Sequence, residues 1–162
     1  MPDEKPLAAT VAYCGFRVGK RKFGVPVFLI KEVQAPTPIA PVPGAPPAVR
    51  GYVNLRGNLY LVLDPRELLT GESSNVAEDG HFIVFNALAG EAFAIQTDGV
   101  EDIVSIGEDQ IDVPNAETRR LTDGNGQLQP LVTGHAKLED GLMTLVEPRQ
   151  LLSAVFHGSP TT

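Results

Sequence analysis

One stretch of this chain occurs twice. Residues 49–69 align without gaps on residues 132–152. Upstream, Phe23-Gly24-Val25 corresponds to Phe93-Ala94-Ile95, so the repeated unit is longer than the aligned stretch. A unit of roughly 70 to 80 residues is too long for a solenoid repeat and long enough for a small barrel with its own core. The sequence therefore predicts two similar modules, and the identical positions in the aligned stretch are Val49/Val132, Gly51/Gly134, Leu55/Leu138, Leu59/Leu142, Pro65/Pro148, Arg66/Arg149, Leu68/Leu151 and Leu69/Leu152.

The signals along the chain are those of short strands. Residues 11–18 and 23–33 are rich in β-branched and aromatic residues, and the polar link Gly19-Lys20-Arg21-Lys22 is short enough for a hairpin. In each copy of the repeat two apolar runs bracket a short loop, Arg56-Gly57-Asn58 in the first and Glu139-Asp140-Gly141 in the second. Glycine can supply the positive φ that such loops need, so both copies read as hairpins with three-residue loops.

A helical turn is expected at the end of each repeat. Asp64 is an N-cap residue type, Pro65 suits the first helical position, and two leucines follow. Glu147-Pro148 repeats the plan, and the C-terminal helix is expected from Pro148 to about Phe156. In contrast, residues 36–47 are not expected to form a helix, because the prolines at positions 36, 38, 41, 43, 46 and 47 have no backbone N–H to donate. The segment is predicted to be an extended surface connection.

Five short strands per module predict an all-β fold of two similar five-stranded β-barrels related by a pseudo-twofold axis, with short helical turns and a C-terminal helix. The first barrel is expected at about residues 16–77 and the second at 78–147, and the sequence leaves exchange of strands at these boundaries open. The domain as a whole is expected over residues 12–155, between flexible ends at 1–11 and 156–162.

Strand Leu59–Leu63 is apolar on both faces, where a strand with one solvated face would alternate. Something must cover its outer face. The sister barrel or the terminal helix would do so, and a partner-binding patch is the alternative.

Composition narrows the class of function. The chain of 162 residues has 13 Lys and Arg against 20 Asp and Glu, a net charge of −7, and its basic residues form no stripe, which argues against nucleic acid as a partner. No apolar run reaches the length of a membrane span and no signal-peptide pattern opens the chain, so we expect a cytoplasmic protein without membrane insertion. The single cysteine, Cys14, is expected to be a core residue.

Charge is unevenly distributed between the halves. Residues 1–77 carry 9 basic and 6 acidic groups, residues 78–126 carry 2 and 11, and residues 127–162 carry 2 and 3. Two accounts fit this asymmetry: each module has its own partner, or the acidic loops only keep the protein soluble.

Several motifs occur in a fixed order along the chain, at residues 23–27, 30–33, 39–43, 49–57 and 63–66, with Asp98-Gly99-Val100-Glu101-Asp102-Ile103 in the second half. Together they resemble the signature of CheW-type chemotaxis coupling proteins, over about residues 12 to 155. The resemblance implies the double-barrel fold and an adaptor role, bridging the cytoplasmic tips of chemoreceptors and the regulatory domain of a CheA-type histidine kinase. Leu61 departs from the family, which usually has proline there, and the second-barrel run Leu138–Leu142 matches loosely.

The same resemblance suggests a receptor-binding site. Arg56 and Gly57 belong to the Asn-Leu-Arg-Gly turn, which is similar to part of the family's receptor-contacting region, and an arginine fork suits a carboxylate or carbonyls on a partner helix. Val27, Ile30 and Glu32 match positions near the groove that receives the receptor. The alternatives are an arginine that supports its own turn and apolar residues that pack in the core. Kinase-binding residues stay unassigned.

No enzymatic motif is present in the sequence, and the histidines His81, His135 and His157 are scattered. A carboxylate dyad of Asp64 and Glu147 is the strongest catalytic alternative, but both residues act more naturally as helix caps. We therefore expect a scaffold with no catalytic residue, metal or cofactor. Two other functions stay open: coupling in a twitching or gliding motility pathway, and a small-ligand-binding double barrel, which an apolar cavity inside a barrel would favour.

Overall fold

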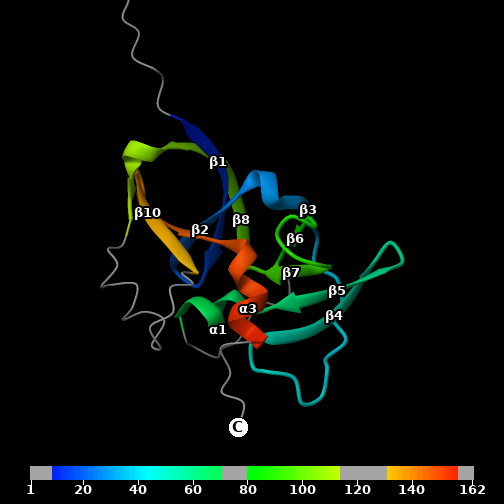
Figure 1. Cartoon of the computed structure of the whole chain (residues 1–162). Helices are drawn as coiled ribbons and strands as arrows, with labels where there is room; N and C mark the ends of the chain where they lie inside the picture. Colours follow the sequence, from blue (N-terminus) through cyan, green and yellow to red (C-terminus); the bar gives the residue numbers. More distant parts are fainter. Residues whose placement is uncertain (1–8, 71–79, 114–130, 157–162) are drawn as a thin grey trace, which may run out of the picture.

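Residues 9–70, 80–113 and 131–156 are described by the computed structural model, and they form two β-sheets with short helices between and beside them (Figure 1). Sheet A contains, in spatial order, β8 (Gly99–Gly107), β1 (Thr10–Val18), β2 (Arg21–Pro26), β11 (Gly141–Val146), β10 (Val132–Leu138) and β9 (Ile111–Asp112). Sheet B contains β3 (Ile30–Gln34), β6 (Phe82–Phe85), β7 (Phe93–Gln96), β5 (Asn58–Leu63) and β4 (Val49–Leu55). The helical elements are η1 (Val27–Leu29), α1 (Pro65–Thr70), η2 (Glu108–Gln110), η3 (Pro148–Gln150) and α3 (Leu151–Phe156).

The two repeats exchange strands reciprocally. The first hairpin of the chain, β1–β2, joins the late strands β8–β11 in sheet A, while the hairpin β6–β7 joins the early strands β3–β5 in sheet B. Each exchanged hairpin meets its sheet through a parallel pair, β2 with β11 and β7 with β5. The two barrels therefore are not made of residues 16–77 and 78–147 in sequence. Each sheet instead contains one whole hairpin from the other repeat.

Both sheets curl into barrels in the same way. After β3 the proline-rich segment returns to the far edge of sheet B, where Ala40 and Tyr52 exchange two backbone hydrogen bonds of 2.8 and 2.9 Å. After β8, β9 pairs with β10 in the same manner, and Asp112 lies opposite His135. The repeated glycines explain how the segments come so close: a Cβ on Gly51 would lie 2.2 Å from the Ala40 carbonyl oxygen, and one on Gly134 would lie 2.9 Å from that of Asp112.

The duplicated stretch adopts the same elements in both copies. The β4–β5 and β10–β11 pairs share one register, including an irregularity after Val49 in one and after Val132 in the other. A helical element follows each pair, although the second copy starts with the 3₁₀ turn η3 before α3. The prediction that both copies have the same secondary structure is confirmed.

Apolar residues form three clusters. One lies inside each barrel, and the third is shared between the sheets and α3, which lies between them in Figure 1. Strand β5 contributes to two of these clusters: Tyr60 and Val62 face the interior of barrel B, while Leu61 and Leu63 face the shared core together with Leu151 of α3. This explains the strand that is apolar on both faces, and buried Cys14 also belongs to the shared core, as expected.

Three local expectations were wrong. The run 23–33 is not one strand, since β2 ends at Pro26 and η1 carries the chain from sheet A to sheet B with Leu29 fully buried. Both hairpin loops have two residues, because Asn58 and Gly141 already pair with Leu55 and Leu138. At the N-terminus β1 begins at Thr10, inside the end expected to be flexible, because Thr10 and Val11 pair with β8. The predicted flexible residues 1–8 and 157–162 lie outside the described residues.

Candidate functional site at the seam of barrel B

The predicted receptor-contacting residues gather at the seam where barrel B closes. In the order of sheet B, β3 and β4 are opposite edges. Across this seam Arg56 Nη2 lies 2.9 Å from Glu32 Oε1, and Lys31 Nζ lies 2.8 Å from the Tyr60 hydroxyl. The fold thus brings together Glu32 and Arg56, which are far apart in sequence.

The turn that carries Arg56 has an unusual backbone. Arg56 has φ of 55° and Gly57 has φ of 88°, and the flanking residues Leu55 and Asn58 pair directly. Positive φ at both central positions is the pattern of a type I′ hairpin turn. The Gly57 N–H donates to Asn54 Oδ1 at 2.9 Å, which ties the turn to its own strand. Arginine pays a conformational cost in this region, so the surrounding contacts must hold it there.

Glu32 supplies such a contact. Arg56 Nη1 also donates to Glu32 Oε2 at 3.2 Å, which makes the pair bidentate, and Gln34 Nε2 donates to Glu32 Oε1 at 2.6 Å. The Arg56 side chain is 71% exposed and that of Glu32 only 19%. The arginine therefore supports its turn internally, as the alternative reading held, and still presents one side of its guanidinium to solvent.

Val27 and Ile30 occupy a different setting. Both are partly buried and pack against the shared core, and Ile30 pairs with Phe85. This packing is what the alternative for apolar residues expects, and contact of these two residues with a receptor stays a prediction.

An apolar groove runs beside the seam, and we call it the seam groove. Its volume is about 590 Å³. Leu59 on its wall is 59% exposed, and two further apolar residues that are more than half exposed, Phe28 and Leu88, are joined to it through Asn86. Asn86 Nδ2 donates to the Phe28 carbonyl at 2.8 Å, and the Leu88 N–H donates to Asn86 Oδ1 at 3.0 Å. The residues that line the groove are Lys31, Asn58, Leu59, Tyr60, Phe85, Asn86, Ala87, Glu91 and Ala92.

Sequence reasoning did not select the groove residues one by one, although it left a partner-binding patch on strand Leu59–Leu63 open. The available signal was the apolar outer face of that strand, on which Leu59 is exposed and Leu61 is partly buried. Lys31 contributes a cation to the groove, and its hydrogen bond to the Tyr60 hydroxyl raises the lysine pKa.

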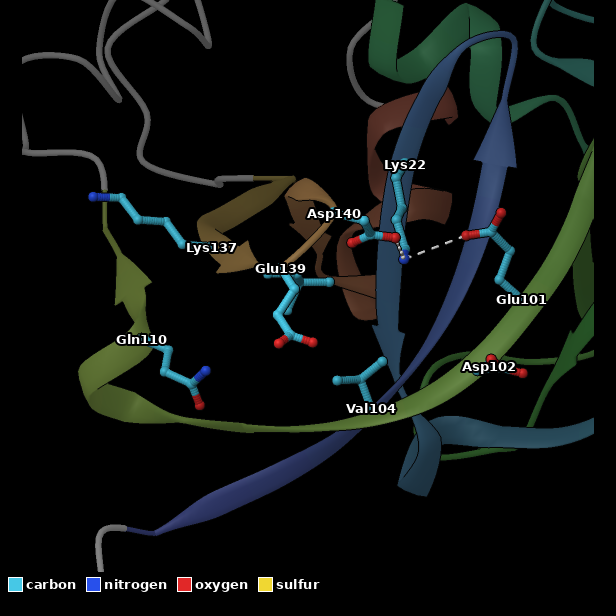
Figure 2. Close-up of a pocket in the computed structure, with 9 residues that line it drawn as sticks. Lys22, Glu101, Asp102, Val104, Gln110, Lys137, Glu139 and Asp140 are labelled. Atoms are coloured by element: carbon cyan, nitrogen blue, oxygen red, sulfur yellow. Dashed lines mark hydrogen bonds and ion pairs between the residues drawn. The ribbon is translucent and has the colours of Figure 1, made fainter.

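The mouth of barrel A is a second hollow, of about 810 Å³, and it is lined mainly by charged side chains (Figure 2). Lys22 lies between two carboxylates there, 3.4 Å from Glu101 Oε1 and 3.4 Å from Asp140 Oδ2. The polar lining differs from the apolar cavity that the small-ligand alternative called for.

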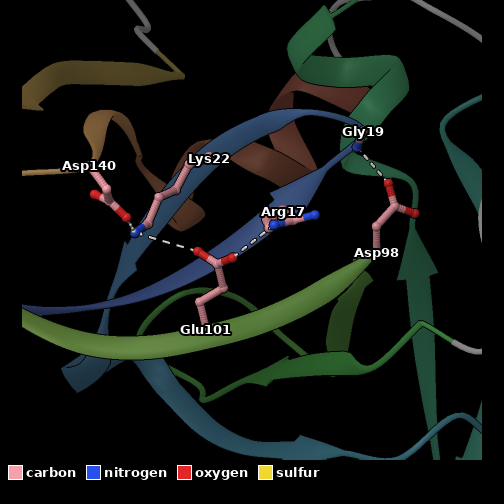
Figure 3. Close-up of polar contacts among 6 residues, drawn as sticks. All are labelled: Arg17, Gly19, Lys22, Asp98, Glu101 and Asp140. Carbon is pink, nitrogen blue, oxygen red and sulfur yellow. Dashed lines mark hydrogen bonds and ion pairs between the residues drawn. The ribbon is translucent and has the colours of Figure 1, made fainter.

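Ion pairs in this region connect the basic half of the sequence to the acidic half. Glu101 pairs with Arg17 as well as Lys22, and Asp98 accepts the Gly19 N–H (Figure 3). Asp98 also pairs with Arg66. Part of the charge asymmetry is therefore neutralised inside the molecule, which neither account from the sequence anticipated.

The two repeat-equivalent carboxylates act as caps. Asp64 Oδ1 accepts the Arg66 N–H at 2.9 Å, and Glu147 Oε2 accepts that of Arg149 at 3.0 Å. Burial raises the pKa of Asp64. Burial would also raise the pKa of Glu147, but hydrogen bonds from Arg149 outweigh it and lower that pKa. Each carboxylate thus has its own local partner, which supports capping rather than a dyad.

Two features are absent from residues 9–70, 80–113 and 131–156. They contain no group of three or more His, Cys, Asp or Glu side chains able to hold a metal ion. Nor does any helix there have the length and apolar character needed to cross a membrane.

The chain is similar in sequence to several curated chemotaxis proteins named CheW. The chain is 24% identical over 140 residues to the chemotaxis protein CheW of Klebsiella aerogenes, covering 86% of this chain and 80% of the relative. It is 29% identical over 147 residues to that of Helicobacter pylori, covering 89% and 82%. With the Rhizobium meliloti protein it shares 30% identity over 96 residues, which is 59% of this chain and 61% of the relative.

The fold has a solved counterpart. The scaffolding protein TtCheW from Thermoanaerobacter tengcongensis superimposes with a TM-score of 0.69 at 21% identity, covering 85% of this chain and 89% of that one. A family profile described as a CheW-like domain matches residues 12–156, nearly the whole chain. The protein therefore belongs to the CheW-like domain family.

Proposed function

We propose that this protein is a non-enzymatic adaptor of a chemotaxis pathway, which couples the cytoplasmic tip of a chemoreceptor to the regulatory domain of a CheA-type histidine kinase. The proposal draws on the family, since the curated relatives are chemotaxis proteins named CheW and the solved counterpart is a scaffolding protein. Such a role requires surfaces that hold partners, and it places the protein in the cytoplasm at receptor arrays.

The observation that carries the receptor site is the exposed apolar wall of the seam groove. Leu59 lines the groove and is more than half exposed, so a partner can cover it there. Two further exposed apolar residues, Phe28 and Leu88, are bound through their backbones to Asn86, which also lines the groove. A receptor tip formed by amphipathic helices would lay its apolar face on these residues. Lys31 and Arg56 stand at the seam, where they suit acidic side chains on the helix flanks.

The repeat offers a matched control for this site. Leu142 is the repeat equivalent of Leu59 and is similarly exposed, at 56% against 59%. We expect Leu59→Asp to reduce binding of a receptor-tip fragment by at least tenfold, because burying a leucine contributes about 1.5 to 3 kcal/mol. Leu142→Asp should leave receptor binding unchanged. Equal losses in both variants, or none in Leu59→Asp, would remove the seam groove from the receptor site.

Arg56 is tested with its partner Glu32. A charge-assisted contact to the receptor predicts that Arg56→Glu weakens binding more than Arg56→Ala, with losses of about 1.5 to 3 kcal/mol. Since Arg56→Ala also leaves Glu32 with fewer donors, the double variant Arg56→Ala/Glu32→Gln separates the roles. Binding restored by the second substitution would show that Arg56 acts only by neutralising Glu32. Binding of the kinase's regulatory domain, measured separately, should be spared, and its residues on this protein stay unassigned.

A further inference from the structure

The end of barrel B holds a pocket that the adaptor role does not use. It lies where the segment that closes the barrel passes the start of β4 and the end of β7, and its volume is about 570 Å³. Pockets of this size at barrel mouths commonly take small ligands. We call it the proline pocket, after the residues that line it: Pro36, Thr37, Pro38, Ile39, Pro41, Arg50 and Gln96.

Two polar side chains in this pocket lack partners. Gln96 is only 4% exposed, and its buried Oε1 accepts no hydrogen bond. The buried Nε of Arg50 donates none, and among the residues that the structure describes Arg50 has no carboxylate within ion-pair distance. Buried polar groups are nearly always paired in folded proteins, and leaving one unpaired costs stability. Both atoms are covered in this structure, so a ligand in the pocket would pair with them after the Arg50 and Gln96 side chains turn toward it.

The internal repeat shows that barrel closure does not need this pair. The register of β4 with β5 and of β10 with β11 makes Thr133 the equivalent of Arg50. In the parallel pairs, Phe93 lies opposite Leu61, and Phe23 lies opposite Thr144, the repeat equivalent of Leu61. Phe23 is therefore the equivalent of Phe93, and Pro26 is the equivalent of Gln96. Thr133 donates to a backbone carbonyl, and Pro26 has no polar side chain. The same architecture thus closes in barrel A without a cation or an amide at these positions.

The charge of Arg50 calls for an anion from outside. Among the residues that the structure describes, no carboxylate lines the proline pocket. Asp64 is close enough for Arg50 to act on it electrostatically, but this carboxylate is buried and already accepts the N–H of Arg66. A ligand carboxylate would supply the missing acceptor, as arginine forks favour carboxylates.

The Gln96 side chain, in the same pocket as Arg50, restricts the chemistry of the ligand further. Gln96 Oε1 requires a donor, and it would repel a second anionic oxygen, so a group bearing both a carboxylate and a nearby N–H fits better than phosphate or sulfate. The walls are pyrrolidine rings and Ile39, which suit an apolar side chain. We propose that the proline pocket binds carboxylates with an adjacent amide N–H, the chemistry shared by N-acylated amino acids and peptide C-termini. Arg50 holds the carboxylate and Gln96 accepts the N–H.

The test uses the full chain and isothermal titration calorimetry. The small-molecule probe is N-acetyl-L-leucine, with its uncharged amide and 4-methylpentanoate, which lacks the N–H, as ligand controls. The peptide arm compares an acetylated tetrapeptide ending in leucine with the same peptide amidated at its C-terminus. The protein variants are Arg50→Gln, Gln96→Met and, at the equivalent site of barrel A, Thr133→Val.

We expect a free carboxylate probe to bind in the millimolar range or tighter. Arg50→Gln, and amidation of the probe, should each weaken binding at least tenfold, about 1.4 kcal/mol, and Thr133→Val should change nothing. Gln96→Met should weaken the binding of N-acetyl-L-leucine more than the binding of 4-methylpentanoate. This comparison tests the proposed site even if Arg50→Gln fails to fold. Tighter binding of the peptide than of N-acetyl-L-leucine would identify a peptide C-terminus as the source.

Absence of binding in both arms, equal binding of the amides, or binding unaffected by both pocket variants would overturn the proposal. Receptor binding is tested separately with variants of the seam groove, so failure here would leave the proposed receptor site intact.

Discussion

The closing segment of barrel B provides the sharpest test of how this fold is held together. Gly51 has φ of 141°, and a Cβ there would meet the Ala40 carbonyl oxygen at 2.2 Å and the Ala40 carbonyl carbon at 2.8 Å. Backbone atoms cannot move aside as a flexible side chain can. Gly51→Ala should therefore push the closing segment off β4 and break the bridge between Ala40 and Tyr52.

The magnitude follows from two terms. A non-glycine residue at this φ costs about 1 to 3 kcal/mol. Loss of the two bridge hydrogen bonds adds about 0.5 to 1.5 kcal/mol each. We expect Gly51→Ala to lower the free energy of unfolding by roughly 3 to 5 kcal/mol, the middle of the summed range.

Two other glycines calibrate this value. Gly57 also has positive φ, 88°, but a Cβ there would have nothing within 4 Å, so Gly57→Ala should cost only the conformational term of about 1 kcal/mol. At Gly134 the nearest atom to a Cβ is Ile111 Cγ2 at 2.6 Å, a side-chain atom, followed by the Asp112 carbonyl oxygen, so Gly134→Ala should fall between the other two.

Urea unfolding at equilibrium measures all three variants, with the m-value as a check that the unfolding transition is unchanged. A Gly51→Ala variant no less stable than Gly57→Ala would refute the idea that close approach of the Ala40 backbone, and not turn conformation alone, requires glycine at this position.

Three further outcomes are expected. Gln96→Met should raise the free energy of unfolding by about 1 kcal/mol, because it removes a buried acceptor without a partner, and thermal unfolding would detect the gain. Ile30→Asp should lower it by about 2 kcal/mol, because Ile30 packs against the shared core; an unchanged melting temperature would contradict that packing. Asp64 and Glu147 should give opposite pH dependence in urea unfolding. The raised pKa of Asp64 gives a contribution present below its unfolded pKa and lost as pH rises through the folded value, and Asp64→Asn should remove it. The lowered pKa of Glu147 gives a contribution present above its unfolded pKa and lost as pH falls through the folded value, which Glu147→Gln should remove.

Local chemistry made much of this architecture predictable from sequence. Apolar runs with short polar links predicted hairpins, Asp64-Pro65 predicted a capped helix, and the gapless repeat predicted two copies of one unit, all of which the structure contains. These signals are local because hydrogen-bonded turns and caps depend on residues only a few positions apart. The motif resemblance likewise led to the family, since it rests on the order and spacing of residues in the chain.

The sequence left an exchange of strands between the barrels open and could not decide it. Either barrel could be completed by the hairpin of its own repeat or of the other, because both copies present similar strands, and similar strands give no local preference. The crossing depends on η1, where Leu29 is buried in the shared core, and that core exists only once both sheets are present.

The candidate site shows the same division. Sequence and family resemblance singled out Arg56 and Glu32, but their pairing across the seam follows from the curling of sheet B, which places opposite edges side by side. Leu59 is exposed and Leu61 is not, although both are leucines of one apolar strand. The sequence by itself determined which strands, turns and caps form, whereas exposure and pairing were decided by tertiary structure, because they depend on which distant segment packs over each residue.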